Sequence, residues 1–406
     1  MTKQLPLTGV RVTDFTWIGA GSYTTKILAD AGAEVIKIES ADRVDSLRLA
    51  APYKDGVKGL NRSGYFADRN SSKRSLTLNM KHPKALELVF RLIRQSDIIA
   101  NNFTPGVMDR FGLGYDAVRA VKEDIIYLTM SMQGASGPQK HYLGYGATMA
   151  AVTGIQHLTG IPGREPAGTG TNYPDHIPNP CHATFAVLAA LRHRRRSGEG
   201  QRIDMAQTEP TVALLGPAVL EYTANGHVPQ ARGNRHPQAA PHGVFRCAGE
   251  DRWIAVTVMN DQQWQGLRTA LGAPAWMDDA RLDSVQGRLA HVEEVEEKLT
   301  TETQRQPVEA LVQVLQEHGV PAGRVSTAAD VIDDPQLRHR GHWLTLNHPE
   351  MGPSLYNAQP FRNARSATGQ ARPAPLLGQH THEICTTLLG LDDAEIARLA
   401  EDGALR

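Results

Sequence analysis

Cysteine is scarce in this sequence, and long apolar runs are missing from it. The three cysteines, Cys181, Cys247 and Cys385, are far apart and odd in number, so they suggest neither a metal-binding spacing nor a disulfide framework. No apolar run approaches the roughly 18 residues that a transmembrane helix needs, and the N-terminus has no apolar signal core. We therefore expect a soluble cytoplasmic protein with no bound metal and no membrane partner.

Net charge is also missing. Lys plus Arg and Asp plus Glu number 43 each, so no overall field attracts a nucleic acid or an anionic membrane. Local basic clusters can still bind a small polyanion. Hydrophobic residues make up 41% and charged residues 21% of the chain, as in ordinary globular proteins. A length of 406 residues is enough for two domains and a large core.

The first half of the chain alternates between apolar segments typical of strands and helical segments. The strands are expected at 10–15, 34–39, 75–80, 97–103, 124–132 and 202–206. This alternation predicts the α/β class, with a Rossmann-like, doubly wound large domain. The turn after the first strand reads Gly-Ala-Gly-Ser at 19–22. It lacks the full G-x-G-x-x-G pattern, so a bound dinucleotide is only a weak alternative.

The composition changes after a proline- and glycine-rich linker at 226–241. We expect residues 1–226 to form the first part of the large domain and residues 227–330 to form a smaller α+β domain. Residues 331–406 would form a linker and a final part of the chain, with late strands at 343–347 and 359–361. Residues 40–72 are polar and irregular, which predicts a loop long enough to be functional.

Asp175 is the acidic residue in the stretch 172–201 that draws attention. Three prolines surround it and bias the residues before them away from helix, which predicts an extended loop at 173–179 and a helix from Cys181 or His182. That helix is apolar on every face and is expected to be buried. Its positive N-terminal end favours a carboxylate at Asp175. A lone Asp at this place is more often a loop or capping residue. Whether Asp175 has a function must therefore be judged from the residues around it.

Those neighbours resemble the class III coenzyme A transferases of the CaiB/BaiF type, which include formyl-CoA transferase and carnitine CoA-transferase. The family has an Asp before a helix reading ILAAL and a later TGxGQ; here residues 187–191 read VLAAL and 197–201 read SGEGQ. Further matches include residues 70–81, 101–113 and 375–381. Taken together, all the matches span residues 7 to 381. The last match implies that the C-terminus returns to the large domain.

The resemblance implies roles for particular residues. Asp175 would be the nucleophile that forms an aspartyl anhydride and then an aspartyl-CoA thioester. Coenzyme A, as free CoA or acyl-CoA, would be a substrate and no cofactor would be tightly bound. The residues that correspond to the family's CoA contacts lie in the matches at 70–81 and 101–113, together with one tyrosine between two glycines. They are Lys73 and Arg74, then Asn102, Phe103 and Arg110, and finally Tyr145. Many relatives have an adenosine-contacting Arg after the second strand. Ser40 stands there in this chain, so the contact is either moved to the nearby Arg43 or lost.

Two alternatives to a transferase stay open. Related α-methylacyl-CoA racemases have a proton-transferring His where this chain has Tyr145. A phenol with a pKa of about 10 is a poor base at neutral pH, which favours the transferase. A catalytically silent subunit of a hetero-oligomer has no reason to keep Asp175. The family also implies a homodimer of interlocked chains, although a hetero-oligomer is possible.

The expected partners are an acyl-CoA and a small carboxylic acid. Trp17 replaces a polar residue of formyl-CoA transferase, and the glycine-rich lid of that enzyme has no counterpart here. Both differences argue against formate and oxalate. We expect succinyl-CoA as a possible donor and a dicarboxylic or aromatic acid as acceptor.

Overall fold

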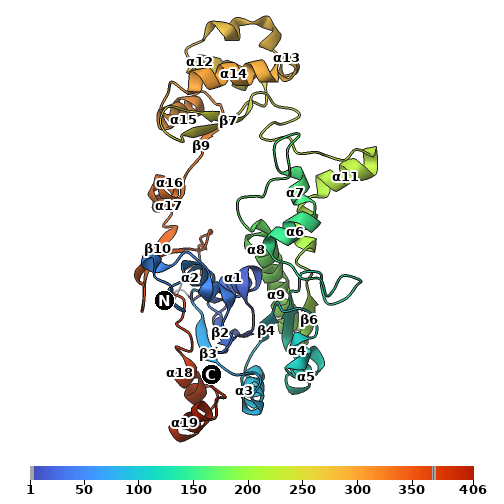
Figure 1. Cartoon of the computed structure of the whole chain (residues 1–406), viewed down its shortest axis with the longest axis vertical. Coiled ribbons are helices and arrows are strands. Elements are labelled where there is room, and N and C mark those ends of the chain that lie inside the picture. The colour runs from blue at the N-terminus through green and yellow to red at the C-terminus, as the bar shows by residue number, and fades with distance from the viewer. Residues whose placement is uncertain (1–3, 368, 370–371) are drawn as a thin grey trace. The chain divides into compact units, whose positions relative to one another are not determined.

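The computed structural model describes residues 4–367, 369 and 372–406, which divide into two compact units (Figure 1). Unit 1 consists of Met1–Gln156, Gly168–Pro229 and Arg338–Arg406. Unit 2 consists of His157–Ala167 and Gln230–Leu337. The short segment His157–Ala167 was placed in the first domain from the sequence. Its glycines and prolines do not indicate with which unit the segment packs.

A parallel sheet of six strands forms the centre of unit 1, in the order β3-β2-β1-β4-β5-β6. This order, 3-2-1-4-5-6, is that of the dinucleotide-binding doubly wound fold. The α/β class with a parallel sheet is thus confirmed. The strands are β1 (Arg11–Asp14), β2 (Glu34–Glu39), β3 (Arg74–Thr77), β4 (Ile98–Asn101), β5 (Ile126–Thr129) and β6 (Gln201–Asp204).

Neighbouring residues on each central strand belong to different apolar clusters, as expected when side chains alternate between the faces of a sheet. Ile98 packs into one cluster with helices α1 (Ile18–Asp30) and α9 (Pro178–Ser197). Ile99 packs into the other cluster, which contains α3 (Pro83–Arg94), α5 (Tyr115–Val121), α18 (Thr381–Thr387) and α19 (Asp393–Glu401). The last two helices bring the C-terminal part of the chain to this sheet.

Shorter elements connect these layers. They are the 3-10 turns η1 (Ser46–Leu49) and η2 (Lys54–Gly56), and the helices α2 (Gly64–Arg69), α4 (Val107–Arg110), α6 (Gly146–Val152), α7 (Ile155–Leu158), α10 (Glu209–Leu214) and α11 (Gly216–Asn225). Helix α2 lies inside the stretch 40–72 that was expected to be a loop. A two-stranded sheet pairs β10 (Trp343–His348) with β11 (Gly352–Asn357). The strand expected at 359–361 is not formed, because the partner of β10 comes earlier in the chain.

The expectation for the segment around Asp175 was wrong in three respects. Residues Tyr173–His176 form a short helix, α8, and α9 begins already at Pro178. Proline fits the first turn of a helix, where its missing N–H would have no partner. Helix α9 is also buried on one face only. Ala183 and Val187 are fully buried, whereas 73% of Phe185 and 42% of Leu188 are exposed.

Unit 2 has an antiparallel sheet of β7 (His242–Arg246), β8 (Trp253–Thr257) and β9 (Ala322–Arg324). Its core surrounds the buried Trp264. Two helices cover residues 292–317, and the second begins after Pro307, which cannot donate the backbone hydrogen bond of a helix interior. The helices are α12 (Asp261–Ala270), α13 (Val285–Ala290), α14 (Val292–Thr303) and α15 (Val308–Glu317), with 3-10 turns at Ala275–Asp278 and Ala280–Leu282; α16 (Ala328–Asp333) and α17 (Pro335–His339) follow in the chain.

Within the described part of the chain, no helix has both the length and the apolar character needed to cross a membrane.

Candidate active site

A cavity of about 860 Å³ lies in unit 1 at the carboxyl ends of the parallel strands. Trp17 and Gly19 follow β1, and Asn102 and Phe103 follow β4. The strand order reverses between these two strands, and ligands of doubly wound folds bind at such a switch point. The fold therefore places the cavity where a substrate site is expected.

Asp175 contributes a buried carboxylate to this cavity. Helix α8 holds it against the start of α1, so closely that a Cβ on Gly19 would lie 2.9 Å from the Asp175 Cβ. A Cβ on Gly146 would lie 2.9 Å from Asp175 Oδ2, and the Gly146 N–H donates a hydrogen bond to the carboxylate. Two glycines are thus required by the approach of one acidic side chain.

Burial raises the pKa of Asp175 to about 6. The positive charge of Arg69 and the hydrogen bond from Gly146 oppose this rise. The carboxylate is therefore ionised at neutral pH but more basic than an exposed aspartate, which favours attack on an electrophilic carbonyl.

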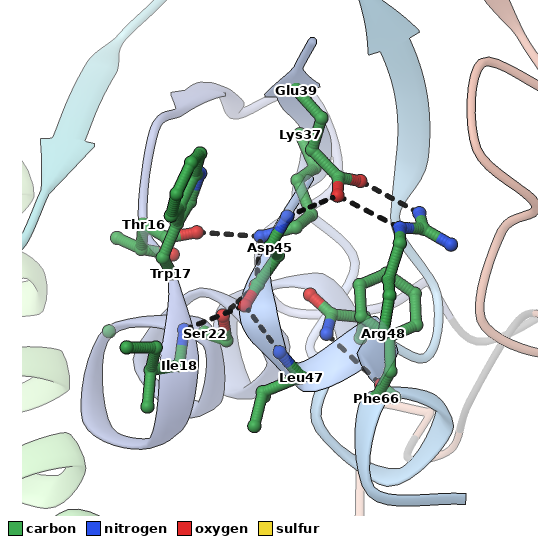
Figure 2. A network of polar contacts seen from close by, with 12 residues as sticks. Thr16, Trp17, Ile18, Ser22, Lys37, Glu39, Asp45, Leu47, Arg48 and Phe66 are labelled. Atoms are coloured by element: carbon green, nitrogen blue, oxygen red, sulfur yellow. Dashed lines mark hydrogen bonds and ion pairs between the residues drawn. The ribbon is translucent and has the colours of Figure 1, made fainter. Parts of the chain in front are cut away.

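The turn Thr16–Ile18 forms the wall beside Asp175, and polar contacts fix it from two sides, of which Figure 2 shows the side of Lys37 and Asp45. Asn102 accepts from the Trp17 N–H over 2.8 Å and donates to the Trp17 carbonyl over 2.7 Å. Asp45 accepts from the Ile18 N–H over 3.1 Å, and Lys37 Nζ donates to the Thr16 carbonyl over 2.6 Å. The backbone at the mouth of α1 is therefore held by side chains from β2, from the segment after β2 and from the end of β4.

Behind this turn lies a buried group of paired charges. Lys37 Nζ lies 2.9 Å from Asp45 Oδ2, and Arg48 Nη2 lies 2.7 Å from Glu39 Oε2 (Figure 2). Burial acts to lower the pKa of Lys37, but the charges of Asp45, Glu39 and Asp14 outweigh it and raise that pKa. Lys37 is therefore charged, and the paired charges compensate one another inside the protein.

Several of the residues named from the sequence lie around the cavity with Asp175. They are Arg43, Asn102, Phe103, Arg110 and Tyr145. The guanidinium of Arg43 lies 5.5 Å from the centre of the Trp17 ring, and the Trp17 and Phe103 rings meet edge to face at 5.7 Å.

Lys73 and Arg74 do not lie at the cavity. Lys73 is fully buried, with its Nζ 3.1 Å from Asp14 Oδ2 and 2.9 Å from Asn70 Oδ1. Burial lowers the pKa of its amine to about 8. Arg74 pairs with Glu34 and with Glu383 of α18. Both cations are thus engaged inside the protein, and neither is presented to a phosphate.

Other residues at the site were not selected from the sequence. Lys81 and Gln207 line the cavity. Lys81 is the last residue of the matched motif at 70–81, so this motif could have identified it as a site residue. The charge of Arg69 lowers the pKa of Asp175, and the Nη2 of Arg69 lies 3.0 Å from His176 Nδ1. No sequence pattern pointed to Arg69, because α2 was hidden in a polar stretch.

Among residues 4–367, 369 and 372–406, no group of three or more His, Cys, Asp or Glu side chains could hold a metal ion.

The fold and the site define an α/β protein with a buried carboxylate at the switch point of a parallel sheet. Comparison with known proteins identifies its family: the model of CoA-transferase family III matches residues 7–381. The chain belongs to this family, and it is an enzyme of the CoA-transferase class. The resemblance seen in the sequence is thereby confirmed.

Individual relatives match over nearly the whole chain. Succinyl-CoA–D-citramalate CoA-transferase of Chloroflexus aurantiacus is 32% identical, covering 97% of this chain and 96% of the relative. Succinate–glutarate CoA-transferase of Agrobacterium fabrum is 32% identical, covering 95% and 96%. The crystal structure of a CAIB/BAIF family protein from Brucella suis superposes with a TM-score of 0.87 at 30% identity, covering 95% of this chain and 100% of the other.

Proposed function

We propose that this enzyme moves CoA from an acyl-CoA donor, such as succinyl-CoA, to a free carboxylic acid, with Asp175 as the nucleophile. The buried Asp175 carboxylate at the end of a ligand-sized cavity is the observation that carries the proposal. Its charge is stabilised by Arg69 and by one backbone N–H.

In the first half of the reaction, an Asp175 oxygen attacks the thioester carbonyl of the donor. The carbon–sulfur bond breaks, which gives a mixed anhydride and CoA thiolate. The thiolate then attacks the Asp175 carbonyl carbon of the anhydride and expels the donor acid as its carboxylate. The result is a thioester between Asp175 and CoA.

In the second half, the carboxylate of the acceptor acid attacks the Asp175 thioester and expels CoA thiolate. The thiolate attacks the acceptor carbonyl of the new anhydride, which forms the product acyl-CoA and restores the Asp175 carboxylate. Every step exchanges one activated acyl bond for another. Positioning therefore matters more than basicity, and well-oriented groups reach effective molarities of about 10⁵–10⁸ M.

The cavity supplies the surroundings that a CoA molecule needs. Trp17, Phe103 and Phe111 give it an aromatic wall, and Arg43, Lys81 and Arg110 are exposed cations along it. Aromatic faces suit the adenine ring, and cations suit the phosphates. Tyr145, which lines the cavity and is 68% exposed, would donate a hydrogen bond to the acyl group.

The proposed acceptor is a short dicarboxylic acid. The names of the two relatives above, at 32% identity, combine a succinyl donor or acceptor with citramalate or glutarate. Both acids carry a second carboxylate, and the sequence had favoured this class together with aromatic acids.

A single incubation in D₂O tests the proposal. The protein is mixed with succinyl-CoA, a branched acyl-CoA and a panel of free acids, and all CoA esters are read by mass spectrometry. We expect new CoA esters without deuterium at the α-carbon, and none with Asp175→Ala. Deuterium at the α-carbon without acyl exchange would establish the racemase instead, and full turnover by Asp175→Ala would exclude the proposed nucleophile.

We also propose that two copies of the chain associate through the exposed face of α9 and the helices after it. Large apolar side chains gather on these elements, and they are Phe185, Leu188, Val212, Leu214, Val219, Leu220 and Tyr222. Water-exposed apolar surface of this extent on one unit is typical of an interface. A homodimer is the proposed state, with a related second subunit as the alternative.

A further inference from the structure

A second cluster of side chains lies near Asp175 without lining the cavity. It consists of Tyr23 on α1, Tyr65 and Arg69 on α2, and His176 on α8. Three helices thus meet beside the proposed nucleophile, and the contacts of α1 with α2 and with α8 hold them together. The charges of Arg69 and of the Asp175 carboxylate influence each other. The mechanism above uses only the charge of Arg69, and none of the four side chains lines the CoA cavity.

Arg69 is the centre of the cluster. Its guanidinium lies 4.3 Å from the centre of the Tyr23 ring and 5.7 Å from that of the Tyr65 ring. Its Nη2 lies 3.0 Å from His176 Nδ1, and its Nη1 lies 2.5 Å from Asp68 Oδ2. Aromatic faces and one neutral ring therefore position the cation. The partly exposed Asp68 is the carboxylate that pairs with it among the described residues.

One buried hydrogen-bond donor of the cluster has no partner in the described part of the chain. The Nε–H of Arg69 has no partner within the described part of the chain. Because a guanidinium only donates hydrogen bonds, His176 Nδ1 must accept from Arg69. Burial and the Arg69 charge lower the pKa of His176 to about 4, so the ring is neutral and its Nε2 carries the proton. A positive charge and an imidazole N–H thus occur together.

The direction of the substrate follows from the chemistry at Asp175. The thioester carbonyl must lie at the Asp175 oxygens, and the CoA portion extends from it into the cavity. The acyl portion must leave that carbonyl on another side of the carboxylate. Arg69 and Tyr65 interact electrostatically with Asp175 although neither lines the cavity, and His176 contacts Arg69. The acyl chain would extend toward these residues.

Resting on the function proposed above, we propose that Arg69 and His176 form the receptor for the second carboxylate of a short dicarboxylic acid or its CoA ester. The guanidinium would provide the charge, His176 Nε2–H a hydrogen bond, and Tyr23 and Tyr65 the walls. A charge-assisted hydrogen bond of this kind is strong where water is scarce. A substrate with a methyl group in that place would leave the Arg69 Nε–H without an acceptor.

The test compares matched acids with Arg69→Met. Succinyl-CoA is compared with butyryl-CoA as donor, and glutarate with valerate as acceptor, which differ in the distal carboxylate. We expect kcat/KM for succinyl-CoA to fall at least about 100-fold, and kcat/KM for butyryl-CoA to fall much less. Arg91→Met on the exposed surface of α3 makes the same chemical change and should alter neither value.

Equal losses for both donors would overturn the inference, because Arg69 would then act only through Asp175. Should Arg69→Met fail to fold, two further measurements decide. Arg69→Lys keeps the charge and should retain part of the preference for succinyl-CoA. Wild-type enzyme should be inhibited by free glutarate at concentrations where valerate has no effect, and equal inhibition by the two acids would also overturn the inference. Absence of CoA transfer by the wild type would instead refute the proposed function itself.

Discussion

Asp45 accepts a hydrogen bond from the backbone N–H of Ile18 and so holds a β-branched residue in the left-handed conformation, at φ 59°, directly before Gly19. Such a conformation costs a β-branched residue on the order of 1–3 kcal/mol. The surrounding contacts have to supply that energy. They also determine how α1 begins, and hence where its first N–H groups lie beside Asp175.

We therefore predict that Asp45→Asn destabilises the fold. The substitution leaves the fully buried Lys37 amine without its nearest counter-charge, and a broken buried ion pair costs about 3–5 kcal/mol. Urea denaturation followed by circular dichroism should show this loss, and kcat should fall with it. Asp55→Asn removes a carboxylate from an exposed pair and is the control that should change neither quantity. An unchanged urea midpoint for Asp45→Asn would mean that the buried charges are not coupled as described.

Gly19→Ala should reduce kcat by about 100-fold, the effect of displacing a reacting group by roughly 1 Å. The new methyl would lie 2.9 Å from Asp175 Cβ, so the carboxylate must move. Alanine favours helix over glycine, so the fold should persist. Gly216→Ala also changes a glycine near the start of a helix, but its methyl would meet open space, and this control should keep full activity. Steady-state kinetics and melting curves of both variants provide the check.

Local patterns were sufficient to predict the sheet from the sequence. Each central strand is a short apolar run, and the six strands were all expected within a few residues of their observed bounds. The position of Asp175 was also predictable, since it stands in a motif. The helical start at Pro178 was not, because the rule that proline disfavours helix before it competes with the tolerance of a first helical turn for proline.

Properties that depend on contacts between distant segments could not be predicted. The sequence shows that Lys73 and Arg74 are charged, but not that Asp14, Glu34 and Glu383 neutralise them. Arg69 illustrates the same limit in the other direction. Arg69 comes close to Asp175 only because α1, α2 and α8 pack together. Neither its spacing in the sequence nor its neighbours in the chain predict this packing.

The pH dependence of the reaction should report the Asp175 carboxylate. Burial raises its pKa to about 6, and only the ionised form attacks the thioester. The value of kcat/KM should therefore rise with pH through about 6 and level off above it. Arg69 lowers this pKa, so Arg69→Met should move the rise to higher pH, while Arg91→Met should leave it in place. A profile that is flat between pH 5 and pH 8 would contradict the assignment.

The same carboxylate should affect stability in a pH-dependent way. A group whose pKa rises on folding, here from 3.8 to about 6, binds more protons in the folded state, so its contribution to stability falls as pH increases across that interval. Asp175→Asn removes the buried charge. It should raise the free energy of unfolding at pH 8 by up to about 3 kcal/mol and have little effect at pH 4. Thermal melts at the two pH values test the sign directly.

The proposed association of two chains predicts a response to charge on α9. Phe185→Asp places a carboxylate where 73% of an apolar ring is exposed in the single chain. Burying that charge in an interface is unfavourable, so light scattering after size-exclusion chromatography should show a shift from dimer to monomer. Val57→Asp, at a residue 55% exposed outside the proposed interface, should leave the mass unchanged. A monomeric wild type would remove the basis for the proposal.

The cations at the cavity should bind the phosphates of CoA, which mutation can test. Arg43 and Lys81 follow β2 and β3, at the edge of the cavity opposite to β5 in the strand order. If they bind the 3′-phosphate, Arg43→Met and Lys81→Met should raise KM for succinyl-CoA by about tenfold each, the equivalent of one charged hydrogen bond. Neither should affect KM for the 3′-dephospho ester to the same degree. Lys84→Met removes an exposed lysine that pairs with Glu87 outside the cavity and is the matched control. Equal losses on both esters would assign these cations to the diphosphate, because that group is present in both.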